Sequence, residues 1–196
     1  MPTFRCFVAI DLSPDVRRAL ESLVLRLRSL PGHESLRWVQ PDSIHLTLEF
    51  LGDQPLASVP DLASMLDRTC AGRAPFSLRL GRLGCFPDAR RPRVLWVGLE
   101  EPTGSLARLQ ASIRTACAQL GLKVDERAFS PHLTLGRVRR EAGSEAADFA
   151  RLVLSGTEAP MAAQMAAEAV HLYRSDLRPT GASYTRLHSA VLAAPA

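Results

Sequence analysis

The tetrapeptide HLTL occurs at residues 45–48 and again at residues 132–135, and this repeat decides how we expect the chain to fold. Side chains two residues apart on a β-strand point to the same face. Each copy therefore puts a His and a Thr side by side and turns its two Leu side chains into a core. We expect two similar halves packed about a pseudo-twofold axis, so that two His and two Thr side chains meet in one cleft.

Strands and helices alternate on both sides of the two copies. We predict strands at residues 4–12, 36–39, 44–51, 76–86, 93–99, 132–138 and 184–192, and helices at 16–30, 61–70 and 103–120. The alanines between Met161 and Val170 favour a helix there. Because no linker or low-complexity tract divides the chain, we expect one α+β or α/β sandwich of two similar halves.

The composition is that of a globular protein with a mild basic excess. The 196 residues are 46% hydrophobic, enough for one core, and the net charge is +4. Lys123 is the single lysine, so the positive charge is almost wholly arginine. Guanidinium groups suit phosphate recognition, but a basic excess of this size is also typical of a solvated surface, and it only permits an anionic substrate.

The cysteines and the N-terminal residues indicate an intracellular protein. The four cysteines, at positions 6, 70, 85 and 117, form no CxxC pair, so they predict buried thiols rather than a zinc site or a redox motif. The N-terminal residues lack the pattern of a signal peptide, and no apolar stretch is long enough to cross a bilayer. We expect a cytoplasmic protein with no membrane partner.

The repeated His and Thr suit one reaction in particular. Opening a cyclic phosphodiester requires a base that deprotonates water, an acid that protonates the leaving oxygen, and donors that hold the other phosphate oxygens. Imidazole serves as either acid or base near neutral pH, with a bell-shaped rate expected at roughly pH 6 to 8, and threonine hydroxyls donate hydrogen bonds. Metal binding is the alternative, although no carboxylate stands at ligand spacing as in HExxH. The other histidines, His33, His171 and His188, are expected to be structural.

The sequence resembles the two-histidine phosphoesterases, in particular the RNA 2′,3′-cyclic phosphodiesterases formerly called 2′-5′ RNA ligases. The stretches that carry the resemblance are RCFVAIDL (5–12), RWV (37–39), HLTLEFLG (45–52), FP (86–87), RVLW (93–96), FSPHLTLGR (129–137), YRS (173–175), Gly181 and Tyr184. The resemblance implies an α+β bilobal fold in a single domain, residues 1–196. Its two pseudo-symmetric lobes of antiparallel sheet would carry outer helices and enclose a central groove. It also implies a strand at 168–174 in place of the helix that propensity favours.

The resemblance further implies a role for each residue of the repeat. His45 would be the proton donor, His132 the proton acceptor, and Thr47 and Thr134 the hydroxyls that hold the phosphate, leaving a terminal 2′-phosphate. Strand alternation puts Arg137 on the face opposite to His132 unless a bulge turns it, so a surface arginine and a phosphate contact stay equally open.

Substrate, partners and competing functions follow from the same resemblance. We expect RNA ends or oligoribonucleotides with a 2′,3′-cyclic phosphate as substrates, no cofactor, no metal and a monomer. The same groups would catalyse the reverse reaction as a 2′-5′ RNA ligase, and a non-catalytic module that binds RNA ends or nucleotides is the third hypothesis. Trp38 and Phe129 could stack on a base, but both are expected in the core.

Overall fold

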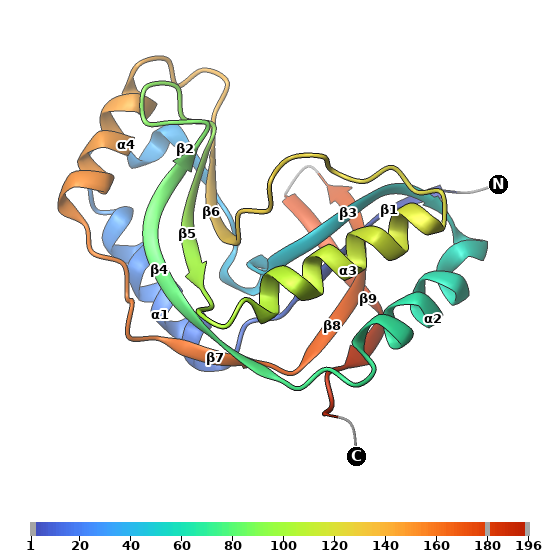
Figure 1. Cartoon of the computed structure of the whole chain (residues 1–196). Helices are drawn as coiled ribbons and strands as arrows, with labels where there is room; N and C mark the ends of the chain where they lie inside the picture. The colour runs from blue at the N-terminus through green and yellow to red at the C-terminus, as the bar shows by residue number, and fades with distance from the viewer. Residues whose placement is uncertain (1–2, 179–180, 195–196) are drawn as a thin grey trace.

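The computed structural model describes residues 3–178 and 181–194, which form nine strands and four helices (Figure 1). The strands are β1 (Thr3–Ile10), β2 (Leu36–Trp38), β3 (Leu46–Pro55), β4 (Phe76–Phe86), β5 (Val94–Glu100), β6 (His132–Val138), β7 (Gln164–Ala167), β8 (Ala169–Arg178) and β9 (Gly181–Val191). The helices are α1 (Pro14–Leu27), α2 (Val59–Cys70), α3 (Ser105–Gln119) and α4 (Glu145–Gly156).

The strands form one antiparallel sheet that divides into two lobes. Its order is β7-β4-β5-β6-β3-β1-β8-β9, and β2 pairs with the far side of β6. We call β1, β3, β8 and β9 with α2 and α3 the β1 lobe, and the other strands with α1 and α4 the β5 lobe. The lobes join where β3 meets β6, through the single residue pair Leu46 and Leu133. The predicted bilobal α+β fold is therefore confirmed.

The two halves of the chain repeat one order of elements, which is strand, helix, HLTL strand, helix. In the first half of the chain this is β1, α1, β3, α2, and in the second half it is β5, α3, β6, α4, so that α1 and α3 each pack on the lobe of the other half. The registers match as well, since Ala9, Val8 and Phe7 pair with Thr47, Glu49 and Phe50, while Trp96, Leu95 and Val94 pair with Thr134, Gly136 and Arg137. In each HLTL strand the last leucine is left out of this pairing and forms a β-bulge. Leu48 has no partner on β1, and Leu135 has none on β5.

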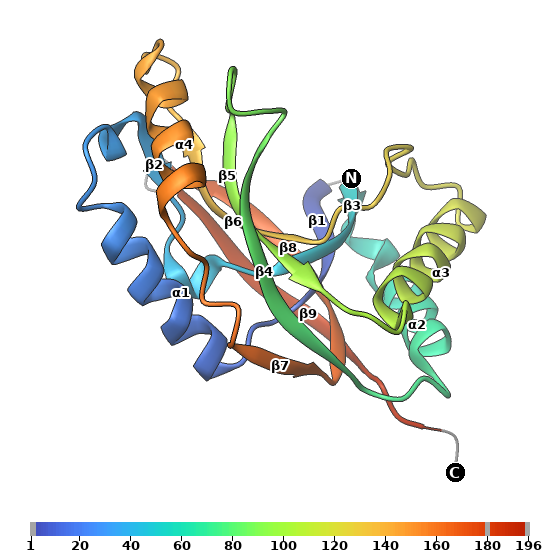
Figure 2. The same ribbon diagram turned by 60° about the vertical axis from the view of Figure 1, so that its left-hand side comes forward.

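Helices cover the outer face of each lobe and leave the face between the lobes open (Figures 1 and 2). Helix α1 begins at Pro14, because the Ser13 hydroxyl accepts a hydrogen bond from the Val16 amide at 3.4 Å and Pro14 occupies the first turn. Its leucines Leu20, Leu23 and Leu27 are fully buried beneath the sheet. The core therefore lies between sheet and helices, as the leucines of the HLTL repeat require.

Two segments differ from the sequence-based prediction, and a third follows the resemblance rather than propensity. Residues 164–167 form strand β7 rather than a helix, because pairing with β4 buries Met165 and Ala167 and outweighs alanine's helix propensity. The strand expected at 168–174 is confirmed within β8. Helix α3 begins two residues later than expected, after Gly104 in a left-handed conformation, with the Glu101 carboxylate accepting from the Leu106 amide at 3.0 Å.

Helix α4 was not predicted, although its sequence carries a helical pattern. Ala146, Phe149, Ala150 and Val153 are buried at helical spacing. In the described residues all four cysteines are free and buried, as expected. None of the helices among residues 3–178 and 181–194 has the length and apolar character of a membrane span.

Candidate active site

The two histidines lie at the join between the lobes and are held in the same way. His45 directly precedes β3 and His132 opens β6, so each is the residue before the paired leucine. The Nδ1 atom of His45 lies 2.9 Å from the Ser43 carbonyl oxygen, and that of His132 lies 2.7 Å from the Ser130 carbonyl oxygen. Because a carbonyl only accepts, each Nδ1 carries the hydrogen, and Nε2 of a neutral ring carries the lone pair.

The His45 ring is packed in a stack of aromatic rings. Phe7 stacks on it with ring centres 4.7 Å apart, and Tyr184 meets it edge-on at 5.1 Å. Tyr173 also stacks on Phe7, at 5.4 Å, and its ring centre lies 6.5 Å from that of His45. The Tyr173 hydroxyl donates to the Asp11 carboxylate at 2.8 Å, and Arg186 pairs with the same carboxylate. The stack therefore fixes the plane of the His45 ring.

The His132 ring lies against a second, smaller aromatic group. Phe86 meets it edge-on at 4.9 Å, and the Trp96 ring centre lies 6.2 Å away. Trp96 covers Gly84, where an added Cβ would come within 2.2 Å of the indole. Glycine at this position lets the indole lie flat on β4 beside His132.

Burial lowers the pKa of both histidines. It lowers the pKa of His45 to about 4, against the opposing effects of the Ser43 carbonyl and Asp11, while Arg137 and His132 lower it further. Burial also lowers the pKa of His132, with Arg137 adding to the effect. Both rings are therefore neutral at pH 7 in the unliganded protein.

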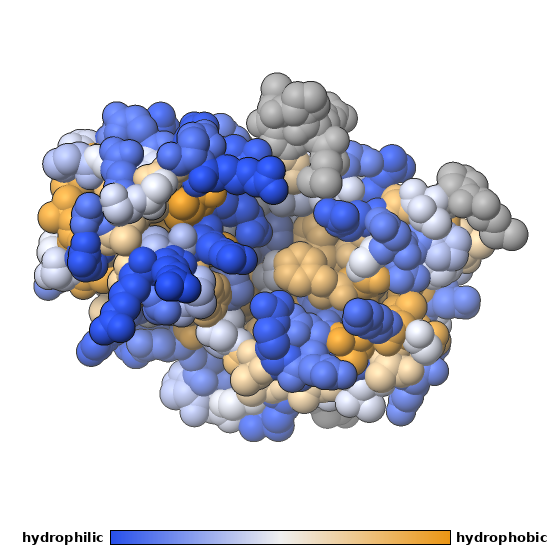
Figure 3. Space-filling model, turned by 90° about the horizontal axis from the view of Figure 1, so that it is seen from above, coloured by the Kyte–Doolittle hydropathy of each residue, from blue (hydrophilic) through white to orange (hydrophobic). Residues whose placement is uncertain are grey.

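The structure brings all five residues predicted for the site to one face. Thr47 and Thr134 follow their histidines by two residues and are half-buried. Arg137 does not lie on the opposite face, because the bulge at Leu135 shifts the alternation by one residue. Arg137 is exposed, and its charge acts on both histidines. Seen from above, the surface is hollowed between the lobes (Figure 3).

The matched registers make Phe50 the counterpart of Arg137. Each follows its threonine by three residues, beyond the bulge, and Phe50 pairs with Phe7 at a ring distance of 6.2 Å. Since Phe7 stacks on His45, this pairing puts Phe50 on the face of the histidines, where 57% of its surface is exposed. One end of the site thus presents a cation and the other an aromatic face.

A buried carboxylate ties the segment before His132 to the strand of Thr47. Glu49 is almost fully buried and accepts hydrogen bonds from the Gln110 side chain at 3.3 Å and the Asp125 amide at 3.2 Å. Gln110 also donates to the Leu48 carbonyl at 3.2 Å. Glu49 thereby fixes β3 relative to α3 and to the chain that leads into β6.

The remaining histidines and the proposed stacking residues have structural roles. His171 contacts the Ser189 hydroxyl at 2.9 Å, and His188 contacts Asp67 at 2.7 Å. Trp38 and Phe129 pack against the core, as expected. No three His, Cys, Asp or Glu side chains gather as a potential metal site in the part of the chain that the structure describes.

Comparison with known proteins agrees with this geometry. Residues 12–179 match the family described as the 2′-5′ RNA ligase superfamily. The chain belongs to the 2′-5′ RNA ligase superfamily. It is 30% identical to the RNA 2′,3′-cyclic phosphodiesterase of Methanothermobacter thermautotrophicus over 92% of this chain and 95% of that protein. It is 32% identical to the protein of the same name from Archaeoglobus fulgidus over 93% of this chain and 97% of that one.

Solved structures show the same fold. TT0787 of Thermus thermophilus matches with a TM-score of 0.78 at 29% identity, covering 96% of this chain and 97% of that one. Escherichia coli LigT in complex with 3′-AMP matches with a TM-score of 0.78 at 28% identity, covering 97% of this chain and 99% of that one. The two-histidine phosphoesterase fold expected from the sequence is confirmed.

In this member of the superfamily, sequence reasoning missed the aromatic residues around the histidines. The missed residues are Phe7, Phe50, Phe86, Trp96, Tyr173 and Tyr184. All six lie within or beside the stretches that carried the resemblance, so position in those stretches was the available signal. Their contact with the histidines depends on strand register and could not be read from spacing.

The depressed pKa of His45 predicts a loss of stability in acid. The unfolded chain binds a proton near pH 6.5, whereas the folded chain does so only near pH 4. The free energy of unfolding should therefore fall as the pH drops from 6.5 to 4, by up to about 3 kcal/mol from this residue. Above pH 6.5 the residue contributes no pH dependence.

Urea unfolding of the wild type and of His45→Gln at several pH values checks this. The variant should lose less stability between pH 7 and pH 4.5, while Thr47→Val, which changes no titrating group, should keep the wild-type dependence. Parallel curves for the wild type and His45→Gln would contradict the assignment.

Proposed function

We propose that this chain is a metal-independent RNA 2′,3′-cyclic phosphodiesterase that opens the cyclic phosphate to a terminal 2′-phosphate. The observation that carries the proposal is the symmetric pair of histidines at the Leu46–Leu133 join, each with Nδ1 bound to a carbonyl and Nε2 left as the reactive nitrogen. The names of the relatives support the substrate, and a LigT complex with 3′-AMP supports a nucleotide in the groove. Residues 1–196 would act as one bilobal domain, a cytoplasmic monomer.

In the proposed reaction, water attacks phosphorus opposite the 3′ oxygen. His132 Nε2 takes a proton from the water as the new P–O bond forms, and His45 gives its Nε2 proton to the 3′ oxygen as the P–O3′ bond breaks. Thr47 and Thr134 donate hydrogen bonds to the non-bridging oxygens. Arg137, turned toward the histidines by the bulge, holds the negative charge of the phosphate.

Asp11 partly offsets the effect of burial on the pKa of His45. Its carboxylate raises the pKa of His45, whereas no carboxylate of the described residues shifts that of His132. Tyr173 and Arg186 hold Asp11 in place. A bound phosphate anion between the rings would raise both pKa values, so substrate binding itself would favour protonation of one ring, which the resemblance to the family assigns as His45.

Phe50 is proposed to carry the base of the terminal nucleotide. A nucleotide is itself asymmetric, with an anion at one end and an aromatic base at the other. The pseudo-symmetric positions of Arg137 and Phe50 offer a matching cation and aromatic face. Base stacking on an exposed phenyl ring is tolerant of base identity, as an enzyme for RNA ends requires.

Replacing either histidine should abolish most of the activity. His45→Ala and His132→Ala should each lower kcat/KM for 2′,3′-cyclic AMP by on the order of a hundredfold or more, with the double variant little worse, because the pair acts in one displacement. Thr47→Val or Thr134→Val should cost roughly 1.5 to 3 kcal/mol of transition-state stabilisation. Assays in EDTA, with product identified by phosphorus NMR, provide the measurement.

Two outcomes of that assay would overturn the proposal. One is near-full turnover by both single histidine variants. The other is loss of activity after dialysis against EDTA with recovery on adding zinc or manganese, because the histidines would then be metal ligands. His188→Ala is the matched control and should retain wild-type turnover.

The pH dependence should be more acidic than unperturbed histidines predict. Since kcat/KM reports the free enzyme and the pKa of both rings is depressed there, its optimum should lie below pH 6.5 rather than at pH 6 to 8. The optimum of kcat, which reports the complex, should lie at higher pH because bound phosphate raises both values. Stopped assays from pH 4 to 9 measure both, and coincident optima above pH 7 would be incompatible with two buried neutral rings.

Removing the Phe50 ring should weaken substrate use without disabling the acid and base. Phe50→Ala should lower kcat/KM for 2′,3′-cyclic nucleotides by about tenfold, mainly through KM, since stacking on one ring is worth about 1–3 kcal/mol. Phe50→Tyr should restore it. Leu56→Ala removes a similarly exposed side chain just beyond β3 and should have no effect. An unchanged KM in Phe50→Ala would exclude the stacking role.

A further inference from the structure

Arginines continue from the site along one edge of the β5 lobe. Arg37 on β2 lies directly opposite Arg137 on β6, so the two side chains leave the same face of the sheet. Arg139 follows Arg137 by two residues, and its amide still bonds to the Ser35 carbonyl at 2.8 Å, so the pairing and the alternation extend to it. We call Arg37 and Arg139 the arginine rim, which begins where Arg137 ends the proposed phosphate site.

Within the described part of the chain, no carboxylate pairs with the rim or with Arg137. Arg37, Arg137 and Arg139 are all exposed, and none has a carboxylate at ion-pair distance within residues 3–178 and 181–194. Like charges directly opposite on neighbouring strands repel each other. An anion bound between them would remove this repulsion, which makes the rim a site for negative charge rather than a neutral surface.

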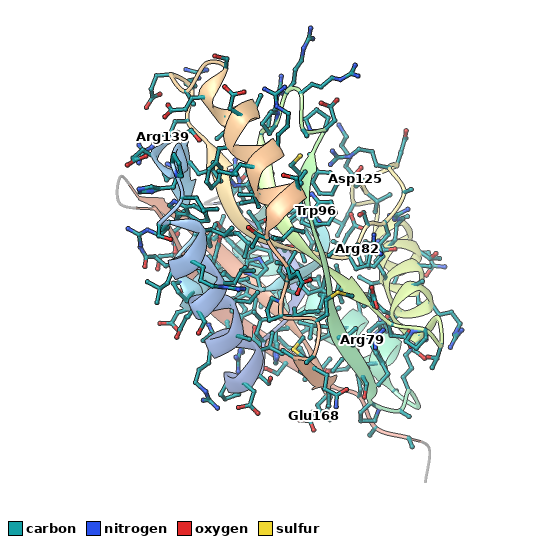
Figure 4. The ribbon with its side chains drawn as sticks, turned by 90° about the vertical axis from the view of Figure 1, so that its left-hand side faces the viewer. Arg79, Arg82, Trp96, Asp125, Arg139 and Glu168 are labelled. Atoms are coloured by element: carbon teal, nitrogen blue, oxygen red, sulfur yellow. The ribbon has the colours of Figure 1, made fainter. Side chains whose placement is uncertain are left out.

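Arg82, another exposed arginine of the β5 lobe, is separate from the rim. Arg82 on β4 lies across the β5 lobe from Arg139, on the other side of Trp96 in the view of Figure 4. Strongly hydrophilic side chains border the hollow on the side of the β5 lobe (Figure 3). Arg139 is the next arginine after Arg137 along the chain, so the positive charge continues from Arg137 away from the histidines.

We propose that the arginine rim binds the phosphates of the RNA chain that precede the cyclic end, so that the enzyme prefers oligoribonucleotides to cyclic mononucleotides. This inference rests on the proposed function. An RNA strand continues from its terminal nucleotide through regularly spaced phosphates, and a row of guanidinium groups matches these without reading sequence. An acidic protein segment would match the charge too, but RNA is favoured because the rim is continuous with the proposed cyclic-phosphate site.

The test compares two substrates in two charge-matched variants. The substrates are 2′,3′-cyclic AMP and a pentaribonucleotide ending in adenosine 2′,3′-cyclic phosphate. Arg37→Gln/Arg139→Gln removes the rim, and Arg68→Gln/Arg108→Gln removes two exposed arginines from α2 and α3 on the outside of the β1 lobe. The rim variant should lose about tenfold in kcat/KM for the pentamer and less than twofold for cyclic AMP, while the control variant stays at wild-type values on both.

Salt dependence gives a second readout. The slope of log kcat/KM against log salt for the pentamer should become shallower by about 1.4 in the rim variant, since each lost contact to a single-strand phosphate removes about 0.7. Three results would each show that the rim does not contact RNA. They are equal losses of kcat/KM on both substrates in the rim variant, no loss on either substrate, and the same loss in the control variant.

A direct binding measurement tests the rim independently of the proposed reaction. Fluorescence anisotropy with a labelled pentamer ending in a 2′-phosphate should show weaker binding to the rim variant than to the control, whether or not the protein turns over cyclic phosphates. Wild-type protein that binds this RNA through the rim but hydrolyses neither substrate would refute the proposed function alone. Competition by polyglutamate as strong as by unlabelled RNA would refute the assignment of RNA as the partner.

Discussion

The backbone pair between Leu46 and Leu133 is the contact on which the rest of the site depends. It is where β3 meets β6, and through it the two lobes share one sheet. Because each leucine follows its histidine directly, joining the strands at this point brings the two imidazoles into electrostatic reach of each other. A slip of one residue would turn one histidine into the core and one leucine into the groove. Both leucines are fully buried, which stabilises this register.

Differences between the two halves of the chain make the two sides of the site unequal. The repeat supplies two equivalent imidazoles and two equivalent hydroxyls, whereas the proposed reaction needs one acid and one base. The residues around the repeat break the symmetry, since Asp11 raises the pKa of only one of the two site histidines, His45, and Phe50 stands where the other half has Arg137. We infer that duplication explains the paired groups, and that the surrounding residues assign their roles.

The sequence was sufficient to predict how side chains point on the strands that carry the repeat. It was insufficient to predict which residues surround those strands. Alternation within HLTL correctly predicted which side chains enter the core, because it depends only on the backbone of an extended strand. Arg137 could not be placed in this way, because a bulge is set by pairing with β5, which the local sequence does not encode. Propensity predicts a helix in place of β7 for the same reason, since the pairing of β7 with β4 is a tertiary contact. The aromatic stack on His45 joins β1, β8 and β9, which only the folded sheet brings together.

The central claim is that His45 and His132 act on one phosphate. Nitrogen-15 NMR of protein labelled at its five histidines, titrated in EDTA with adenosine 2′-phosphate, tests it most directly. The account predicts that the Nε2 signals of His45 and His132, assigned through His→Gln variants, both shift toward the protonated form, while Nδ1 of each stays protonated and the other three histidines are unaffected. A response from only one of the two, or from neither, would contradict it.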